Sequence, residues 1–298
     1  MPLAGWAKEH GLGEPQRVPD MPVAAYAIGS KYGNMVLEIG SREAMWNGIG
    51  ITLGFAPQFI DGEISLYGVD LDKNLEPLLC EPPLTFAPGG TIVIDPGHGG
   101  SNVGTHSVLD GRFEKEFTLD WAQRLRPLLE AEGWHVLLTR NSDVYVTNAE
   151  RTVFANAHHA DLYISLHFNS GAPDTTQAGL ETYCLTPTGE PSTLTRGYAD
   201  PWNENLPNNR FDAQNLQLAV RVHEALLRRM GLADRGVRRA RFIEVLRGQA
   251  HPAILIEAGY LSNPAEAARI ESTEYRQKLA EVLAAALKPT EPPNEDRR

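Results

Sequence analysis

The sequence is poor in the residues and motifs that mark several large protein classes. Its 298 residues include only two cysteines, Cys80 and Cys184, and neither lies in a C-x-x-C pair, which excludes a cysteine-rich scaffold. No apolar run approaches the roughly 20 residues that span a bilayer. The chain also lacks a G-x-S-x-G elbow, a Walker A sequence and a dinucleotide fingerprint. These absences disfavour nucleophile-elbow hydrolases, P-loop NTPases and Rossmann dehydrogenases.

Positive charge is scarce as well. The 27 Lys and Arg residues are outnumbered by 38 Asp and Glu residues, which gives a formal net charge of −11. This balance disfavours electrostatic binding to nucleic acid or to an anionic membrane. We therefore expect no nucleic-acid partner, and the lack of a long apolar run predicts no membrane span. The first residues of the chain do not show the basic-then-apolar pattern of an export signal.

A stretch rich in proline and glycine, residues 80–90, divides the chain. Its three prolines and double glycine are typical of a linker or boundary turn. Short β-rich runs precede it at 35–41, 48–55 and 63–71, and a D-G pair at 61–62 predicts a tight turn. We predict a small β-rich (α+β) module at 1–88, a larger domain at 89–288 and a polar tail at 289–298.

Strand and helix patterns alternate after residue 90. The apolar runs that predict strands lie at 91–95, 135–139, 162–166, 179–185, 242–246 and 253–256. The segments with helical periodicity lie at 114–132, 148–159, 213–230 and 273–287. This alternation predicts an α/β fold with a mixed, mostly parallel sheet flanked by helices. Residues 186–212 are polar and show no periodicity, which predicts a long loop.

Ionisable residues follow three of the predicted strands. His98 comes just after the strand at 91–95, His167 ends the strand at 162–166, and Glu257 ends the strand at 253–256. Sites in open α/β sheets gather beyond the carboxyl ends of the strands. Glu114 opens a predicted helix nearby in the sequence. Two imidazoles and one carboxylate form the ligand set of a catalytic zinc ion, and a further glutamate can serve as general base.

Each of these residues also has an ordinary interpretation. A lone histidine at a strand end is more often structural, and Glu114 can simply interact with the helix dipole. By composition alone, Glu116 is as good a ligand as Glu114. Asn169 is either a turn former or a group aimed at substrate, and Arg151 is either an ion-pair former or a substrate contact. Asp95 is predicted to orient a histidine rather than bind metal.

Four segments resemble the zinc-dependent N-acetylmuramoyl-L-alanine amidases of bacterial cell-wall metabolism. They are "VIDPGHGG", "EKEFTLDWAQRL", "ADLYISLHFNS" and "PAILIEAGYLSNPAEA", and the similarity runs over about residues 91–288 in the order of that family. The resemblance implies one zinc ion held by His98, Glu114 and His167, with Glu257 as the catalytic acid/base. It places the carboxylate ligand before Lys115, which favours Glu114.

The same resemblance implies a substrate and a place of action. The expected reaction is hydrolysis of the amide between the lactyl group of N-acetylmuramic acid and L-alanine in peptidoglycan, in the cell envelope, either periplasmic or extracellular. Asn169 and Arg151 are the predicted substrate contacts. Some relatives carry a helical insert that a partner withdraws. Residues 186–212 show no amphipathic helix, so we expect a loop lining the cleft, and the sequence does not specify an activator.

Two alternative functions remain open at this point. One is a zinc peptidase that cuts the stem peptides of peptidoglycan with the same ligand set. The other is a non-catalytic peptidoglycan-binding protein built on an amidase fold.

The N-terminal region has a resemblance of its own. Residues 37–79, "LEIGSREAMWNGIGITLGFAPQFIDGEISLYGVDLDKNLEPLL", are similar to the stalk-type module related to the copper amine oxidase N-terminal domain. The shared features are a G-S…N-G hairpin and a D-G turn before a final strand and helix. No copper site is implied.

Overall fold

The structure is a computed structural model that describes residues 1–19, 21–194 and 200–290. Most of the tail predicted at 289–298 therefore lies outside the described residues. The helices are α1 (Leu3–Glu9), α2 (Gly68–Asp70), α3 (Glu76–Leu79), α4 (Glu114–Ala131), α5 (Asn148–Ala157), α6 (Asp212–Met230), α7 (Glu244–Arg247), α8 (Pro264–Glu271) and α9 (Thr273–Ala286). A π-helical turn at Leu71–Leu75 joins α2 to α3, and a 3-10 helix covers Pro207–Phe211. None of the described helices is long and apolar enough to cross a membrane.

The strands are β1 (Gln16–Arg17), β2 (Ala25–Gly29), β3 (Asn34–Glu38), β4 (Glu43–Trp46), β5 (Ile49–Thr52), β6 (Gln58–Ile60), β7 (Glu63–Ser65), β8 (Thr91–Pro96), β9 (His135–Leu138), β10 (Leu162–Asn169), β11 (Leu180–Cys184), β12 (Asp234–Arg239) and β13 (Ala253–Tyr260). Eleven of these described strands form one sheet in the order β1-β2-β3-β4-β5-β12-β11-β13-β10-β8-β9. Strands β13, β10, β8 and β9 are parallel, and β11 is antiparallel to β13. The predicted mixed sheet is confirmed.

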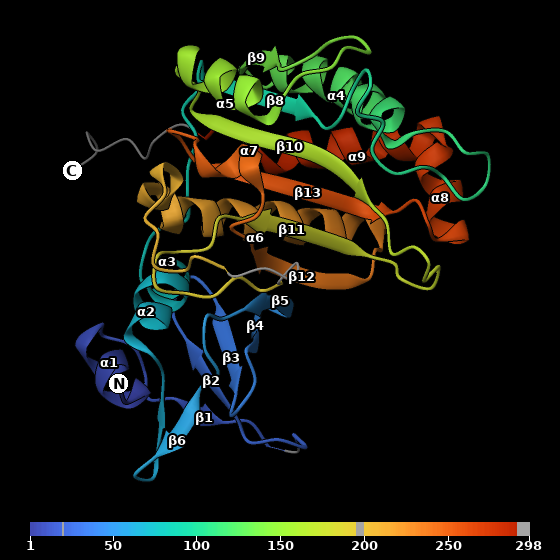
Figure 1. The fold of residues 1–298 in the computed structure, drawn as a ribbon. Helices are drawn as coiled ribbons and strands as arrows, with labels where there is room; N and C mark the ends of the chain where they lie inside the picture. The colour runs from blue at the N-terminus through green and yellow to red at the C-terminus, as the bar shows by residue number, and fades with distance from the viewer. Residues whose placement is uncertain (20, 195–199, 291–298) are drawn as a thin grey trace.

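Helices cover both faces of the C-terminal part of this sheet. In Figure 1, α6 and α9 lie behind the strands, while α5 and α7 lie in front of them. The side chains of β8 show the two layers, because Ile92 and Ile94 join the larger core cluster and Val93 joins a smaller one with residues of α5 and α7. Burial on both faces explains why the central strands read as continuous apolar runs.

One predicted strand is wrong. Residues 242–246 form no strand, and α7 begins inside that run at Glu244. The strand of this region is β12, whose sequence DRGVRR contains no apolar run. Its polar residues have specific partners in the fold, because Asp234 lies 3.0 Å from the buried His223 ring and Arg239 donates to Asn74. Because its charged side chains have specific partners, β12 needs no apolar run, and the sequence pattern does not predict it as a strand.

The N-terminal region is β-rich, as expected. Strands β2 to β5 form an antiparallel meander. The N-G turn between β4 and β5 has φ of 50° at Asn47 and 84° at Gly48, and the D-G turn between β6 and β7 has φ of 52° at Asp61 and 87° at Gly62. Two successive positive φ values are the signature of tight hairpin turns. The run predicted as a strand at 63–71 ends at Ser65, and helix follows from Gly68.

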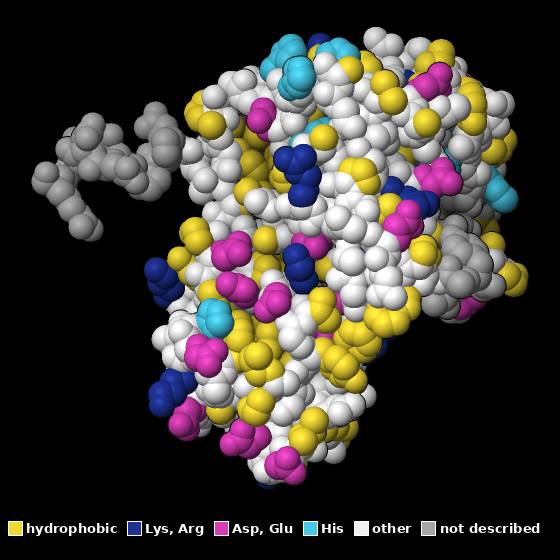
Figure 2. Space-filling model, turned by 60° about the vertical axis from the view of Figure 1, so that its left-hand side comes forward, with side chains coloured by type: hydrophobic (Ala, Val, Ile, Leu, Met, Phe, Trp, Pro, Cys, Tyr) yellow, Lys and Arg dark blue, Asp and Glu magenta, His cyan; other side chains and the backbone are white. Residues whose placement is uncertain are grey.

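The N-terminal region continues the sheet of the larger domain. Strand β5 pairs in parallel with β12, with Ile51 opposite Val237, and Gly50 N–H donates to Asp234 at 2.8 Å. Apolar side chains from both regions belong to the same core cluster. In the space-filling view the lower module and the upper body are continuous, with acidic and basic side chains interspersed over both (Figure 2). The division at about residue 88 stays a prediction.

Candidate metal centre and active site

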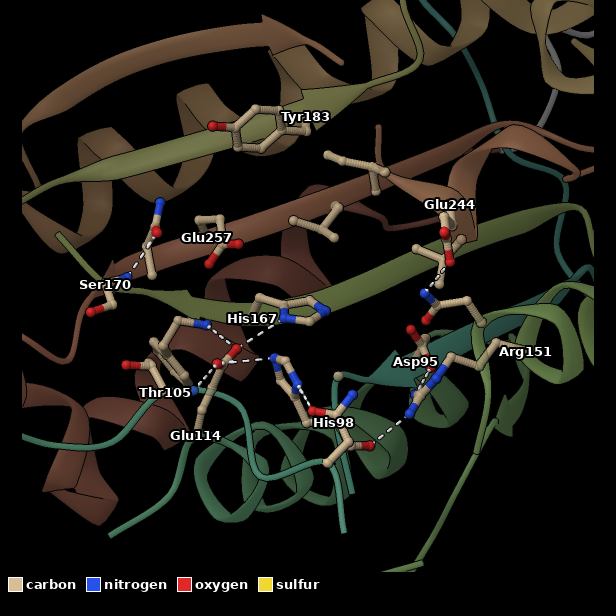
Figure 3. Close-up of a pocket in the computed structure, with 18 of the residues that line it drawn as sticks. Asp95, His98, Thr105, Glu114, Arg151, His167, Ser170, Tyr183, Glu244 and Glu257 are labelled. Carbon is tan, nitrogen blue, oxygen red and sulfur yellow. Dashed lines mark hydrogen bonds and ion pairs between the residues drawn. The ribbon is translucent and has the colours of Figure 1, made fainter. Parts of the chain in front are cut away.

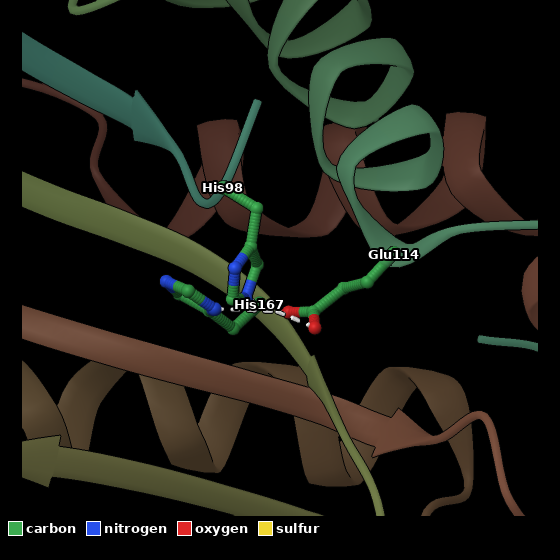
Figure 4. Close-up of side chains that lie close together, drawn as sticks. All are labelled: His98, Glu114 and His167. Atoms are coloured by element: carbon green, nitrogen blue, oxygen red, sulfur yellow. Dashed lines mark hydrogen bonds and ion pairs between the residues drawn. The ribbon is translucent and has the colours of Figure 1, made fainter. Parts of the chain in front are cut away.

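Three predicted ligands meet at one point. Glu114 Oε2 lies 3.0 Å from His98 Nε2, and Glu114 Oε1 lies 2.9 Å from His167 Nδ1. One donor atom from each residue can be chosen so that all three lie within 4.8 Å of one another. Figure 4 shows the two rings and the carboxylate converging from three separate segments. His98 follows β8, Glu114 begins α4 and His167 lies on β10, so the fold joins residues that are up to 69 positions apart.

The Glu114 carboxylate is fixed by the backbone as well as by the histidines. Its Oε1 accepts from Phe168 N–H at 3.1 Å and its Oε2 accepts from Thr105 N–H at 3.0 Å. Burial acts to raise the pKa of Glu114, but the hydrogen bonds from His167 and His98 hold that pKa well below its usual range. For His98, burial acts to lower the pKa, whereas the bond to Glu114 raises it overall. The carboxylate is therefore ionised and aimed at two imidazoles.

Glycines keep side chains away from the ligands. A Cβ placed on Gly97 would lie 2.2 Å from His167 Cε1, and one placed on Gly104 would lie 2.5 Å from Glu114 Oε2 and 2.7 Å from His98 Cδ2. Real Cβ atoms do not approach other atoms so closely, so only glycine fits at these two positions. The glycine-rich sequence around His98 thus provides clearance for the site.

The donor set fits zinc by its chemistry. Two imidazole nitrogens and one carboxylate oxygen are typical ligands of catalytic zinc, which keeps a further position open. A glutamate is ionised at neutral pH, and the charged carboxylate is the form that a cation requires. The second nitrogen of His98, Nδ1, lies 2.8 Å from Asn102 Oδ1. A bond of this kind fixes ring orientation in metal sites.

Glu257 lies beside this cluster. It stands opposite His167 in the parallel pairing of β13 with β10 and opposite Glu181 in the antiparallel pairing of β13 with β11. Figure 3 shows the Glu257 side chain in the same pocket as His167, Glu114 and His98. The fold therefore brings the predicted acid/base next to the predicted ligands.

The pocket has a volume of about 630 Å³. Its polar lining includes the four residues above together with Asn102, Asn169 and Ser170. An apolar and acidic wall comes from residues 242–245, which include Phe242 and Glu244. The described residues of 186–212 do not line this pocket, contrary to the expectation for that part of the segment, and residues 195–199 lie outside the described residues. Residues 190 and 191 contact the N-terminal region instead, where Glu190 accepts from Asn74 at 2.9 Å and Pro191 O accepts from Arg42 at 3.1 Å.

The two predicted substrate contacts differ in setting. Asn169 lines the pocket, and its amide nitrogen donates to Glu181 at 2.9 Å. Arg151 is only 2% exposed, and its guanidinium bonds Asp95 and the carbonyl oxygens of Pro96 and His98. Asp95 does not bond a ligand ring in the described structure, since its carboxylate accepts from Arg151, Thr139 and Ser165. The expected link from Asp95 to a histidine therefore runs through Arg151.

Glu116 is not part of the cluster. Its carboxylate accepts from Phe113 N–H at 3.0 Å and caps the start of α4.

Two residues near the site were not predicted from the sequence. Glu181, on β11, is buried and bonds Asn169, Tyr183 and Arg235. Arg140 is 3% exposed and follows β9, where burial and the neighbouring charge of Arg151 lower its pKa to about 10. A charge inside or directly after an apolar run was the available signal in both cases.

The comparisons with known proteins point to one family. A family model described as N-acetylmuramoyl-L-alanine amidase matches residues 92–289. The sporulation-specific N-acetylmuramoyl-L-alanine amidase of Bacillus subtilis is 34% identical over 198 residues, which are 66% of this chain and 66% of that protein. The amidase CwlM of Bacillus licheniformis is 35% identical with the same coverage of both chains. The chain thus spans just under two thirds of the length of these two relatives.

Solved structures agree with this match. An N-acetylmuramoyl-L-alanine amidase from Clostridium difficile 630 superposes with a TM-score of 0.56 at 30% identity, covering 67% of this chain and 95% of that one. The amidase AmiC2 of Nostoc punctiforme gives a TM-score of 0.55 at 30% identity, covering 68% and 97%. On the family match, the relatives and the shared fold, the chain belongs to the N-acetylmuramoyl-L-alanine amidase family.

Proposed function

We propose that the chain is a zinc-dependent amidase that hydrolyses the bond between the lactyl group of N-acetylmuramic acid and L-alanine in peptidoglycan. The observation that carries the proposal is the convergence of His98, Glu114 and His167 within 4.8 Å, in the same pocket as Glu257. Membership of the amidase family supports the choice of this reaction over other zinc hydrolases.

The residues divide into two roles. His98, Glu114 and His167 would hold one zinc ion, which when bound supplies a Lewis acid that polarises a carbonyl and acidifies water. Glu257 takes the proton from the attacking water and then delivers it to the nitrogen of the departing alanine. Its place opposite His167 on the next strand puts its carboxylate beside the ligand cluster.

The walls of the pocket orient the substrate. Asn169 is held by the buried Glu181, so its amide presents a fixed group to the pocket, and we propose it as a substrate contact. A contact from Arg151 to substrate is the other proposal, although its described hydrogen bonds go to the protein. The apolar side chains of Phe242, Ile243 and Leu255 reduce the water around the reacting bond.

The proposed substrate places the working protein in the cell envelope. Peptidoglycan lies outside the cytoplasmic membrane, so the enzyme would act in the periplasm or outside the cell. One relative at 32% identity, from Staphylococcus epidermidis, is named a probable cell wall amidase. We also propose an activating partner in the cell envelope, to which we assign no binding surface.

Two variants test the mechanism. In Glu257→Gln we expect zinc content to match the wild type while amide hydrolysis falls by about 100-fold or more, because the proton acceptor is lost. In His167→Ala we expect both zinc and activity to fall. Metal content is measured on purified protein, and turnover is measured as loss of turbidity of purified sacculi with and without chelator.

The products identify the reaction. An amidase releases intact stem peptides whose first residue is L-alanine with a free amino group. A stem peptidase leaves shortened peptides on the glycan. Wild-type turnover in Glu257→Gln would contradict the proposed mechanism. Zinc binding without any hydrolysis of sacculi or muropeptides would favour the non-catalytic alternative.

A further inference from the structure

The loop that carries His98 has an unusual backbone. His98 has φ of 63°, Gly99 has φ of 128° and Gly100 has φ of 55°. Glycine tolerates such values, but a histidine in the left-handed region is strained, because its Cβ crowds the neighbouring carbonyl oxygen. Some contact must therefore hold His98 in this conformation.

Two buried arginines supply that contact. Pro96 O accepts from Arg140 Nε and from Arg151 Nη1, both at 2.9 Å. Gly97 O accepts from Arg140 Nη2 at 2.8 Å, and His98 O accepts from Arg151 Nη2 at 2.6 Å. Three successive carbonyls are thus bonded by two guanidinium groups. The Arg151 and Asp95 ends of this arrangement lie beside His98 in Figure 3.

Burying two guanidinium groups in this arrangement costs free energy. Arg140 and Arg151 are 3% and 2% exposed, and of the two only Arg151 bonds the buried Asp95 carboxylate. Burying two like charges beside one acid costs free energy unless each donor is satisfied. The carbonyl oxygens of residues 96–98 satisfy several of these donors, so the direction of the loop and the burial of the arginines depend on each other.

We infer that Arg140 and Arg151 together form a clamp that sets the position of the His98 ring and thereby the zinc affinity of the site. The inference rests on the proposed zinc centre and assigns both arginines as positioning residues. Without the clamp, His98 can relax to negative φ. That rotation turns its Cα–Cβ bond and moves Nε2 from its place 3.0 Å from Glu114.

Lysine substitution separates charge from geometry. Arg151→Lys and Arg140→Lys keep the positive charge, but an ammonium group does not span two carbonyls as the planar guanidinium does. We expect the dissociation constant for Zn²⁺ to rise 10- to 100-fold in each variant, the usual effect of losing a residue that supports a metal ligand. Affinity is measured by competition with a chromophoric chelator on protein whose folding is checked by circular dichroism.

A third arginine provides the matched control. Arg276, on α9, is 5% exposed and bonds Ile270 O and Asp120 rather than the His98 loop. Arg276→Lys should lower the melting temperature of the metal-free protein much as the other two do, yet leave zinc affinity unchanged. In Co²⁺-loaded protein, Arg151→Lys should also shift the visible absorption bands, and Arg276→Lys should not.

The outcomes separate the clamp from the zinc site itself. Wild-type zinc affinity in both Arg140→Lys and Arg151→Lys overturns the clamp and leaves the proposed function standing. An equal loss of affinity in Arg276→Lys also overturns it, because general destabilisation then explains the effect. A wild-type protein that binds no zinc overturns the proposed zinc centre, and the clamp with it.

Discussion

His167 and Gly97 show how tightly single residues are matched at the site. The His167 ring occupies the space where any other residue at position 97 would place its Cβ, at 2.2 Å from Cε1. Backbone and ring come together because Gly97 N–H donates to Leu166 O at 3.0 Å, which ties β8 to β10 at this level. A Cβ at position 97 would therefore displace the His167 ring.

The variant Gly97→Ala tests this fit. We expect the added methyl group to displace the His167 ring and to reduce zinc binding by at least 10-fold, because overpacking a fixed site forces side chains to move. The measurement is zinc stoichiometry and affinity together with the melting temperature. Gly68→Ala serves as the control, since nothing lies within 4 Å of a Cβ at that position. Unchanged zinc affinity in Gly97→Ala would show that the ring has room to move.

At the scale of elements, the segment 186–194 attaches to the N-terminal region. Glu190 is fully buried, its Oε1 accepts from Asn74, and Asn74 also donates to Asp70 at 2.9 Å. Arg42 donates to Pro191 O at 3.1 Å. Burial raises the pKa of Glu190 to about 8, and it raises the pKa of Asp70 to about 6. The carboxylates of Glu190 and Asp70 both accept from the amide of Asn74, and their burial favours the protonated, neutral forms.

This environment gives stability a defined dependence on pH. The pKa of Glu190 is about 8 in the folded chain against 4.5 for the ordinary group, so the folded state holds its proton over a range where the unfolded state has lost it. The free energy of unfolding should therefore fall as pH rises from about 4.5 to 8, with a slope of up to about 1.4 kcal/mol per unit.

Glu190→Gln removes that slope because glutamine imitates the protonated acid. We expect the variant and the wild type to melt at similar temperatures near pH 5, and the variant to melt at a higher temperature at pH 8 to 9. Thermal unfolding followed by circular dichroism at several pH values provides the measurement. Glu63→Gln, at an exposed position on β7, should change neither curve. A variant that is less stable than the wild type at pH 8 would contradict the assignment.

At the scale of the whole molecule, the N-terminal and C-terminal parts of the sheet meet where β5 pairs with β12, and we call this junction the seam. Relatives of known structure match this chain over about two thirds of its length, whereas 95% or more of those chains is covered. Here the sheet continues past β12 into the N-terminal region. The buried Arg239 crosses the seam, donating to Asn74 Oδ1 at 3.0 Å and to Lys73 O at 3.2 Å. The N-terminal strands thus extend the sheet of the C-terminal region through the pairing of β5 with β12.

Truncation tests the seam. Removing residues 1–88 would make β12 an edge strand and leave Arg239 without two of its acceptors, so we expect fragment 89–298 to be poorly soluble or to melt well below the full chain. Solubility, melting temperature and zinc affinity are compared with those of the full chain. A fragment with full-length stability and zinc affinity would show that the N-terminal region is an independent module.

The sequence by itself determined the elements that depend on local pattern. Apolar periodicity located α4, α5, α6 and α9 and the strands β8, β9, β10, β11 and β13, because burial against a sheet repeats every few residues along the chain. The long motifs around His98, Glu114, His167 and Glu257 indicated the family, and the comparisons confirmed it. These features are encoded within segments of at most about 20 residues.

Only the tertiary structure decided the rest. The charged strand β12 is stabilised by partners distant in sequence, such as His223 and Asn74, which local composition does not reveal. The same holds for Arg140 and Arg151, whose acceptors include the backbone carbonyls of residues 96–98. A hydrogen bond to the main chain leaves no residue-type signature at the accepting position, so a clamp of this kind becomes visible only once the chain is folded.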